Sequence, residues 1–237
     1  MLDPKLDPNQ LPEPIWVVAP HPDDEALGCG GLLAALSDLG GEVHALLVTD
    51  GGASHPHSVK YPRPALVGQR LTEWRAGLLE LGIPAGQTVA LGFPDGELAR
   101  SDPARVRSAL ARAWATAPPA TLLLPWRRDP HPDHRACWVC FEPLLGRVPC
   151  VLEYTVWLPE RGEPGDWPQP AEGLSELLFP LSAAQQQRKA NAIAAHRSQL
   201  GLIDDDPSGF VLAPEMVQRA VAGPERFFRH FAGRAGL

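Results

Sequence analysis

The chain has 237 residues, with 21 Lys and Arg against 28 Asp and Glu, which gives a formal net charge of −7. This length and a hydrophobic content of 44% predict one globular domain and argue against wholesale disorder. Such an acidic chain lacks the basic face of a nucleic-acid binder, and no apolar run is long enough to span a membrane. The four cysteines are too few for a disulfide scaffold.

Residues 1–14 are acidic and contain four prolines, and we expect them to form a loosely held arm ahead of a domain at 15–237. The arm has no apolar stretch of the kind that a signal peptide carries. We therefore expect a cytoplasmic protein.

Short apolar runs alternate with segments of helical spacing along the rest of the chain. The predicted strands occupy 15–19, 43–48, 88–93, 121–125 and 151–158. The predicted helices occupy 24–39, 67–81, 103–117, 133–145 and 183–200, with a short helical piece at 224–231, and the predicted loops occupy 53–64 and 160–171. Continuously apolar strands that alternate with helices predict a three-layer α/β fold with a mostly parallel sheet, in a single domain.

Two clusters of histidines and carboxylates follow predicted strands. The segment PHPDDE at 20–25 comes directly after the first strand, and WRRDPHPDH at 126–134 comes directly after the fourth. Ligands of parallel sheets gather at the carboxyl ends of the strands, so we expect both clusters in one crevice. Two imidazoles and one carboxylate suit Zn²⁺, and they also suit Fe²⁺ or Co²⁺.

The segment APHPDDE at 19–25, with the later His131-Pro-Asp-His134, resembles the signature of the PIG-L/LmbE-like family of zinc-dependent N-deacetylases. Further matching segments at 48–51, 93–98 and 189–199 extend the resemblance over about residues 15–200. The family fold is a Rossmann-like sheet, which agrees with the predicted α/β pattern. The resemblance implies a hydrolase that removes an acetyl group from an N-acetylated amino sugar or a conjugate of one.

The same resemblance implies a role for individual residues of the two clusters. It implies that the metal is held by His21, Asp24 and His134. It implies that Asp23 is the general base and that His131 faces the developing oxyanion. Asp133 is then expected to hold His131 in the useful tautomer.

The sequence also contains candidate residues for substrate binding. Arg70 and Asp95 match family positions that line the sugar site. Arg127, Arg128 and Arg135 surround the second cluster and either bind an anionic group of the substrate or offset Asp129 and Asp133. We expect a small-molecule N-acetyl sugar as substrate, and, because relatives assemble as trimers or hexamers, a homo-oligomer.

Two other functions compete with the deacetylase. An amidase of a larger conjugate, such as a thiol–sugar conjugate, uses the same site. A metal-binding module without turnover predicts a coordinatively closed site, and the intact Asp23 and His131 argue against it.

Several other residues have a plain structural interpretation. Cys137 and Cys140 lie inside a predicted helix, which favours buried core thiols over a redox pair. His55 and His57 are expected in a solvated loop. Trp126 is expected either to stack on a sugar ring or to belong to the core.

Overall fold

The computed structural model describes residues 5–230. The strands are β1 (Ile15–Ala19), β2 (Val43–Thr49), β3 (Thr88–Phe93), β4 (Thr121–Pro125), β5 (Cys150–Tyr154), β6 (Leu174–Phe179) and β7 (Glu225–His230). The α-helices are α1 (Asp24–Asp38), α2 (Arg63–Glu80), α3 (Pro103–Ala113), α4 (Pro132–Leu145), α5 (Leu158–Arg161), α6 (Ala183–Ala194) and α7 (Pro214–Ala222). Short 3₁₀ turns lie at Pro8–Gln10, Ala85–Gln87, Leu98–Arg100, Pro170–Glu172 and Arg197–Gln199.

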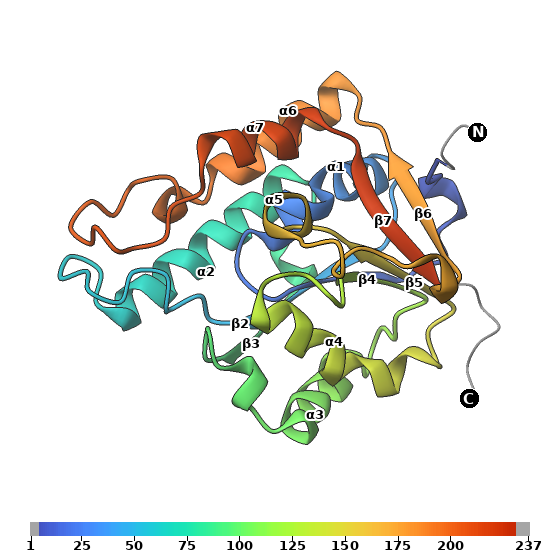
Figure 1. The fold of residues 1–237 in the computed structure, drawn as a ribbon, viewed down its shortest axis with the longest axis horizontal. Helices are drawn as coiled ribbons and strands as arrows, with labels where there is room; N and C mark the ends of the chain where they lie inside the picture. The colour runs from blue at the N-terminus through green and yellow to red at the C-terminus, as the bar shows by residue number, and fades with distance from the viewer. Residues whose placement is uncertain (1–4, 231–237) are drawn as a thin grey trace.

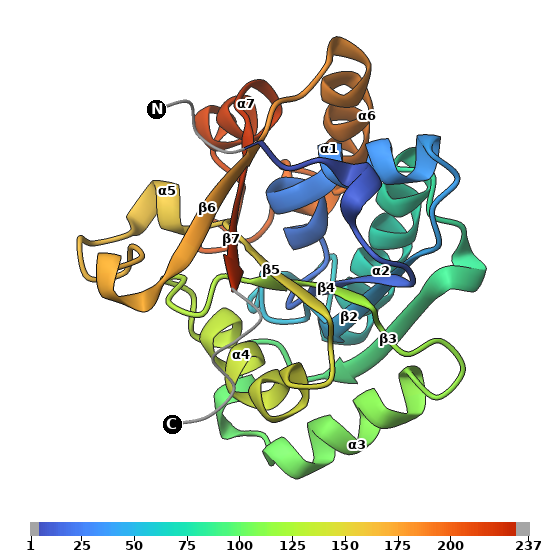
Figure 2. The same cartoon turned by 90° about the vertical axis from the view of Figure 1, so that its right-hand side faces the viewer.

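The strands form one sheet in the order β3-β2-β1-β4-β5-β7-β6. The first five strands of this order are parallel, and β7 runs antiparallel to both of its neighbours, β5 and β6. Figure 2 shows β6 and β7 side by side at one end of the sheet and β3 at the other. The prediction of a mostly parallel sheet in a single domain is confirmed.

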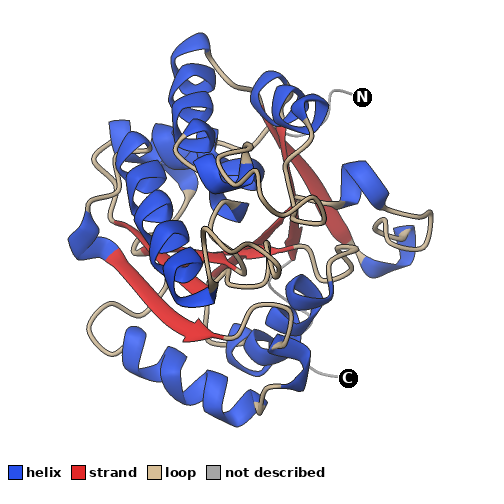
Figure 3. Ribbon diagram, turned by 90° about the vertical axis from the view of Figure 1, so that its left-hand side faces the viewer, coloured by secondary structure: helices blue, strands red, loops and turns tan. Residues whose placement is uncertain are grey.

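Helices cover both faces of the sheet (Figure 1, Figure 3). One hydrophobic core joins the sheet to α1, α2, α6 and α7, and a second core joins the opposite face to α3 and α4. β1 and β4 are buried along their whole length, because they lie inside the sheet and are covered on both sides. Within the described residues, none of the helices has both the length and the apolar character needed to cross a bilayer.

The C-terminal part of the sheet departs from the sequence prediction. Glu225–His230, which lie in the segment predicted as helical, form β7 instead, while β6 and α7 were not predicted at all. Phe227 and Phe228 are adjacent, and both are fully buried, in hydrophobic clusters that do not overlap. Adjacent side chains that pack into separate clusters are typical of a strand covered on both faces. Residue 231 lies outside the described residues.

The N-terminal arm is packed against the domain over residues 5–14. Leu6 and Leu11 are buried, and the backbone N–H of Leu6 donates to the carbonyl of Leu178 at 3.0 Å. The carboxylate of Glu13 accepts from the N–H of Glu42 at 3.0 Å. The expectation of a loosely held arm is therefore wrong for this stretch, because its two leucines join the main core. Residues 1–4 lie outside the described residues.

Helix α1 is broken in its middle, and a distant carboxylate caps the break. Cys29 has non-helical backbone angles of φ −145° and ψ 19°, which interrupts the helical hydrogen bonds. The carboxylate of Glu225 in β7 accepts from the N–H groups of Gly31 and Leu32 at 2.7 and 2.8 Å. The ammonium group of Lys189 in α6 lies 2.7 Å from Glu225 and balances its buried charge.

Close packing around Gly28 gives a prediction about stability. A Cβ at Gly28 would lie 2.2 Å from Cδ2 of Tyr154 and 3.2 Å from the carbonyl oxygen of Thr155, so Gly28→Ala forces buried atoms apart. We expect Gly28→Ala to lower the free energy of unfolding by about 1–3 kcal/mol. Gly68 in α2 is exposed, and a Cβ added there would meet no atom within 4 Å, so the control Gly68→Ala is expected to raise it by up to about 1 kcal/mol. Urea unfolding measures both, and equal midpoints for the two variants would contradict the packing argument.

Candidate active site

The first cluster forms a tight turn between β1 and α1. The backbone N–H of His21 donates to Oδ2 of Asp24 at 2.7 Å, and Nδ1 of the same histidine lies 3.1 Å from that oxygen. Asp24 is the first residue of α1 and is buried. The turn therefore fixes the His21 ring and the Asp24 carboxylate against each other.

The second cluster lies between β4 and α4 and meets the first. Nε2 of His134 lies 3.2 Å from Oδ2 of Asp24, the oxygen that also faces His21. The three side chains predicted as metal ligands, His21, Asp24 and His134, thus converge on one carboxylate oxygen. The rings of His21 and His131 are in edge contact, with centroids 4.5 Å apart, so the two clusters form one site.

The arrangement fits a divalent metal. His134 is fully buried, and neither ring nitrogen makes a hydrogen bond of good geometry to any described residue, although Asp24 and Asp129 lie within 3.3 Å. Ligand atoms of His21, His131 and His134 all lie within 4.8 Å of one another. Those of His21, Asp95 and Asp133 do so as well. Imidazole nitrogens and carboxylate oxygens in such a cluster are the donors that Zn²⁺ and similar ions take.

The electrostatics of the site also favour a cation. Burial alone would lower the pKa of His134, but the carboxylates of Asp24 and Asp129 raise it to about 9. Burial acts in the same direction on His21, where Asp133, Asp24 and Asp95 outweigh it and raise the pKa well above its usual value. The carboxylates around the two rings thus stabilise positive charge at this point.

Asp23 stands in a strained position at the entrance to α1. Its φ of 123° is in the region that favours glycine, and it is the one described non-glycine residue with a positive φ. Such strain persists where the surroundings impose it, and it concentrates at functional sites. Burial raises the pKa of Asp23 to about 7, although the guanidinium of Arg70, 3.1 Å from Oδ2, opposes this shift.

Arg70 holds the turn in place from behind. Its guanidinium donates to the carbonyls of Pro22 and Gly51 at 2.7 and 3.2 Å and contacts Asp23. Arg70 is 3% exposed yet still lines the cavity above the site. The structure therefore places this predicted sugar-site residue behind the predicted base, where it supports the turn.

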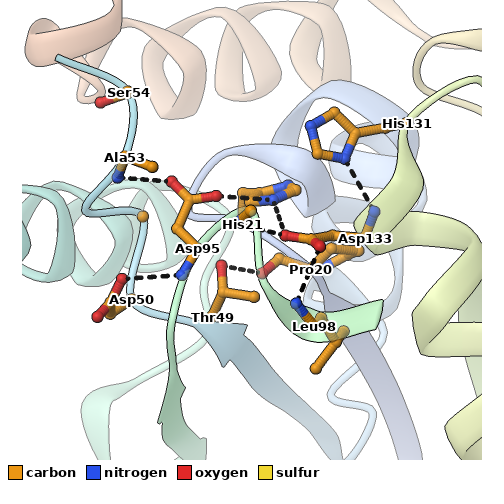
Figure 4. A network of polar contacts seen from close by, with 12 residues as sticks. Pro20, His21, Thr49, Asp50, Ala53, Ser54, Asp95, Leu98, His131 and Asp133 are labelled. Carbon is orange, nitrogen blue, oxygen red and sulfur yellow. Dashed lines mark hydrogen bonds and ion pairs between the residues drawn. The ribbon is translucent and has the colours of Figure 1, made fainter. Parts of the chain in front are cut away.

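The contact between Asp133 and His131 is made by the backbone of Asp133, while its carboxylate contacts other groups. Its oxygens accept from the N–H groups of Gly96 and Leu98 at 2.8 and 3.2 Å, and one lies 3.2 Å from Nε2 of His21 (Figure 4). The carboxylate faces His21 because these N–H groups hold it on that side. His131 is held instead by the backbone N–H of Asp133, which donates to its Nδ1 at 3.2 Å.

This backbone bond sets the tautomer of His131. Because Nδ1 accepts a hydrogen bond, the proton of the neutral ring lies on Nε2. Burial and the positive charge at His21 and His134 lower the pKa of His131 to about 4, so the neutral form is favoured. His131 lines the cavity and can present this N–H to a ligand.

Asp95 lies between the metal cluster and the cavity. Its carboxylate accepts from the N–H of Ala53 at 2.9 Å and lies 3.2 Å from Nε2 of His21 (Figure 4). Because the protonated His21 ring and this N–H stabilise its charge more than burial opposes it, the pKa of Asp95 lies well below its usual value. Asp95 is thus placed for a contact with either substrate or metal.

A cavity of about 370 Å³ opens above these residues. Part of its wall comes from the loop between β2 and α2 and from the loop that precedes α7, which lie side by side (Figure 1). The segment around α5 completes this wall. The wall residues that the sequence did not indicate are Ser54, Trp157, Arg161, Ser208 and Phe210, and Gln199, from the matching segment 189–199, also lines the cavity. The backbone N–H of Phe210 donates to the carbonyl of Ser54 at 2.7 Å and joins the loops.

Two acidic residues of the loop before α7 form hydrogen bonds to the loop between β2 and α2. Asp205 accepts from Ser58, Val59 and Lys60, and Asp206 accepts from the N–H of His57. His55 is buried against Gly209, so the expectation of a solvated His55 is wrong, whereas His57 is exposed. Only the contact between distant loops buries His55, and no local sequence signal reports such a contact.

Asp129 is a candidate site residue that the sequence analysis did not single out. Its Oδ1 accepts from the N–H of His131 at 3.0 Å and lies 3.3 Å from Nδ1 of His134. Its Oδ2 accepts from the N–H of Trp157 at 2.9 Å. Its position within the second cluster was the available signal, but it was considered only as a partner for the neighbouring arginines.

Those arginines have other partners. Arg127 pairs with Glu153, Arg128 pairs with Glu172, and Arg135 donates to the carbonyls of Asp129 and Pro130. The structure thus directs the guanidinium groups away from both of the roles that were weighed for them.

The other residues set aside as structural are in the core. Trp126 is fully buried against Phe228, which confirms the core interpretation over sugar stacking. Cys137 and Cys140 are buried free thiols, as expected.

A family model described as PIG-L, GlcNAc-PI de-N-acetylase, matches residues 16–142, more than half of the chain. This range contains both histidine–carboxylate clusters. Diacetylchitobiose deacetylase from Thermococcus kodakarensis is 33% identical to this chain over 127 residues. The match covers 51% of this chain and 45% of the relative, so the chain spans about half the length of that curated protein.

Solved structures share the fold at low identity. The zinc-inhibited form of teicoplanin deacetylase Orf2 is 15% identical with a TM-score of 0.67, over 94% of this chain and 99% of the other. GalB, the 4-carboxy-2-hydroxymuconate hydratase from Pseudomonas putida, is 16% identical with a TM-score of 0.65, over 94% and 98%. Since proteins named for different reactions share this fold, the fold alone does not identify a reaction.

The contacts of Asp129 predict a role in metal affinity. Asp129→Asn keeps an acceptor for one of the two backbone N–H groups but removes the charge that faces His134, so we expect Zn²⁺ to bind about 10–100-fold more weakly. Calorimetric titration of metal-free protein with Zn²⁺ measures this, with circular dichroism as a check of folding. The exposed Glu97→Gln is the matched control and is expected to bind as the wild type does. Equal affinity in Asp129→Asn and the control would rule out this role.

Proposed function

Because the chain belongs to the PIG-L family of de-N-acetylases, we propose that it is a metal-dependent hydrolase that removes the acetyl group from an N-acetylated amino sugar or its conjugate. The observation that carries the proposal is the Asp24 oxygen shared by His21 and His134, with Asp23 beside it at the cavity floor. The name of the Thermococcus relative, a diacetylchitobiose deacetylase, supports an N-acetyl sugar as the substrate class.

In this proposal His21, Asp24 and His134 hold the metal. Zn²⁺ is the first choice, and Fe²⁺ or Co²⁺ accept the same donors. When bound, such an ion supplies Lewis acidity, which polarises a carbonyl and makes water a better nucleophile near neutral pH. Asp129 and Asp133 orient the two rings, since the first faces Nδ1 of His134 and the second faces Nε2 of His21.

Asp23 acts as the general base. It lines the cavity next to Asp24, and Arg70 fixes its carboxylate, so it can take a proton from a water molecule that attacks the amide carbonyl. The strained φ of Asp23 supports this role, because a relaxed N-cap residue would turn its side chain toward the N–H groups of α1. Asp23 makes no such capping bond.

His131 stabilises the oxyanion. Its Nδ1 is held by the N–H of Asp133, so its Nε2–H is free to donate to the oxygen that gains charge as the carbonyl is attacked. A neutral ring is sufficient for this donation, so the step needs no protonated His131. Either Asp23 or His131 then gives a proton to the departing amine.

Substitution of Asp23 tests the proposed chemistry. Asp23→Asn leaves the three metal-holding side chains in place but removes the base, so we expect bound metal to be retained and kcat to fall by about 10²–10⁴-fold. Release of acetate and free amine from N-acetylglucosamine and diacetylchitobiose is measured alongside metal content. Asp102→Asn, which keeps an N-cap at the distant α3, is the control and is expected to retain full turnover.

Two outcomes would contradict the proposal. Near-wild-type turnover in Asp23→Asn would remove Asp23 as the base. If wild-type protein with metal bound released no acetate from any N-acetyl sugar, the proposed deacetylase activity would be wrong.

A further inference from the structure

A second cavity of about 440 Å³ lies next to the first, between α1, α5, α7 and the start of β7. Its apolar lining includes Leu27, Val156, Pro159, Met216, Ala220 and Pro224. Leu27 lines both cavities. The proposed catalytic residues leave this second cavity without a role.

The partition between the two cavities is thin. Leu27 is in the first turn of α1, where its N–H donates to the carbonyl of Asp23 at 2.9 Å. Val156 lines the second cavity, while the next residue, Trp157, lines the first. The second cavity therefore begins about one side chain away from the predicted base and metal ligands.

The charged side chains that line the second cavity are paired with partners. Lys189 pairs with Glu225, Arg219 pairs with Glu160, and Arg226 pairs with Glu176 outside the lining. A charged ligand would therefore find each opposite charge of the lining already in an ion pair. An uncharged, apolar group suits the cavity, because its binding leaves every pair intact and removes apolar surface from water.

We propose that the second cavity takes the acyl chain of the substrate, so that this enzyme releases acyl groups longer than acetyl from N-acylated amino sugars. The inference rests on the proposed function, because it places the scissile amide at the cluster of His21, Asp24 and His134. The sugar lies in the first cavity, and the acyl chain extends past Leu27 into the second cavity. Polar and charged side chains of the first cavity suit a sugar, and the apolar part of the second cavity's lining, with its charges paired, suits an alkyl chain.

The reaction is the same hydrolysis with a longer acyl group. The oxygen of one water molecule bonds to the carbonyl carbon, the carbon–nitrogen bond breaks, and the nitrogen takes up both protons of the water, so that the amine leaves as an ammonium group. One fatty carboxylate and one free amino sugar are released for each water consumed. No other reactant is needed.

A series of N-acyl glucosamines tests the inference. The metal-loaded enzyme is assayed with acetyl, butanoyl, hexanoyl and octanoyl amides, and both amine and carboxylate are measured. We expect kcat/KM to rise from acetyl to hexanoyl, by up to about fourfold for each methylene that is buried, which corresponds to about 0.8 kcal/mol. A steady fall in kcat/KM beyond acetyl would overturn the inference.

A pair of matched variants on α7 tests whether the acyl chain occupies the second cavity. Ala220 lines the second cavity, and Ala220→Trp fills it without touching the catalytic groups. We expect this variant to lose at least about tenfold in kcat/KM for the hexanoyl amide and to keep its value for the acetyl amide. Gln218 is exposed on the same helix and does not line the cavity, so Gln218→Trp is the control and is expected to change neither value. Equal kcat/KM for the hexanoyl amide in the two variants would mean that the acyl chain binds outside the second cavity.

Binding of the product provides a readout without turnover. Calorimetry with hexanoate is expected to show binding to the wild type and to Gln218→Trp, and at least about tenfold weaker binding to Ala220→Trp. If acetyl amides are cleaved but hexanoate binds all three proteins equally, the inference fails and the proposed function stands. If no amide is cleaved although metal is bound, the proposed function fails and the inference fails with it.

Discussion

The parallel pairing of β1 with β4 is the contact on which the site depends. Ile15 pairs with Thr121 and Val17 with Leu123, so both strands end at the same edge of the sheet. β2 and β3 lie on one side of β1, and β4 lies on the other, which makes this edge a point where the chain order reverses. A crevice opens at such a point because the connections leave it toward opposite sides of the sheet. Side chains 112 residues apart in sequence, such as His21 and Asp133, meet there.

Burial of carboxylates in this crevice is unfavourable, because it removes them from water. Backbone N–H groups that donate hydrogen bonds to these carboxylates offset the penalty. Asp24 accepts from the N–H of His21, Asp129 accepts from two N–H groups, and Asp133 accepts from two more. Each bond offsets part of the desolvation of a buried carboxylate. The same bonds orient the carboxylates toward the histidine rings, so the network that stabilises the turns also positions the proposed ligands. Asp129 extends this network to Trp157 and thereby to the wall of the cavity.

The sequence predicted those parts of the structure that are encoded locally. The apolar runs of β1 and β4 and the two histidine–carboxylate clusters are short, continuous patterns, and the structure has them where they were expected. β7 was wrongly assigned because Phe227 and Phe228 act as strand residues only when both faces of the sheet cover them. The partner of Asp133 and the burial of His55 depend on Gly96, Leu98 and Gly209, which reach these residues from distant loops. Such contacts leave no trace in local spacing.

The start of α1 lies between the two cavities. Asp23 is the N-cap of this helix, its first turn carries Asp24 and Leu27, and the helix is interrupted at Cys29 two residues later. Glu225 caps the second half from β7, at the wall of the second cavity, so the position of the helix is fixed from both sides. A fold shared with proteins named as deacetylases and as a hydratase leaves the choice of substrate to such local features. In the proposed path of the acyl chain, Leu27 is the side chain that both cavities share, and the capped break of α1 lies directly behind it.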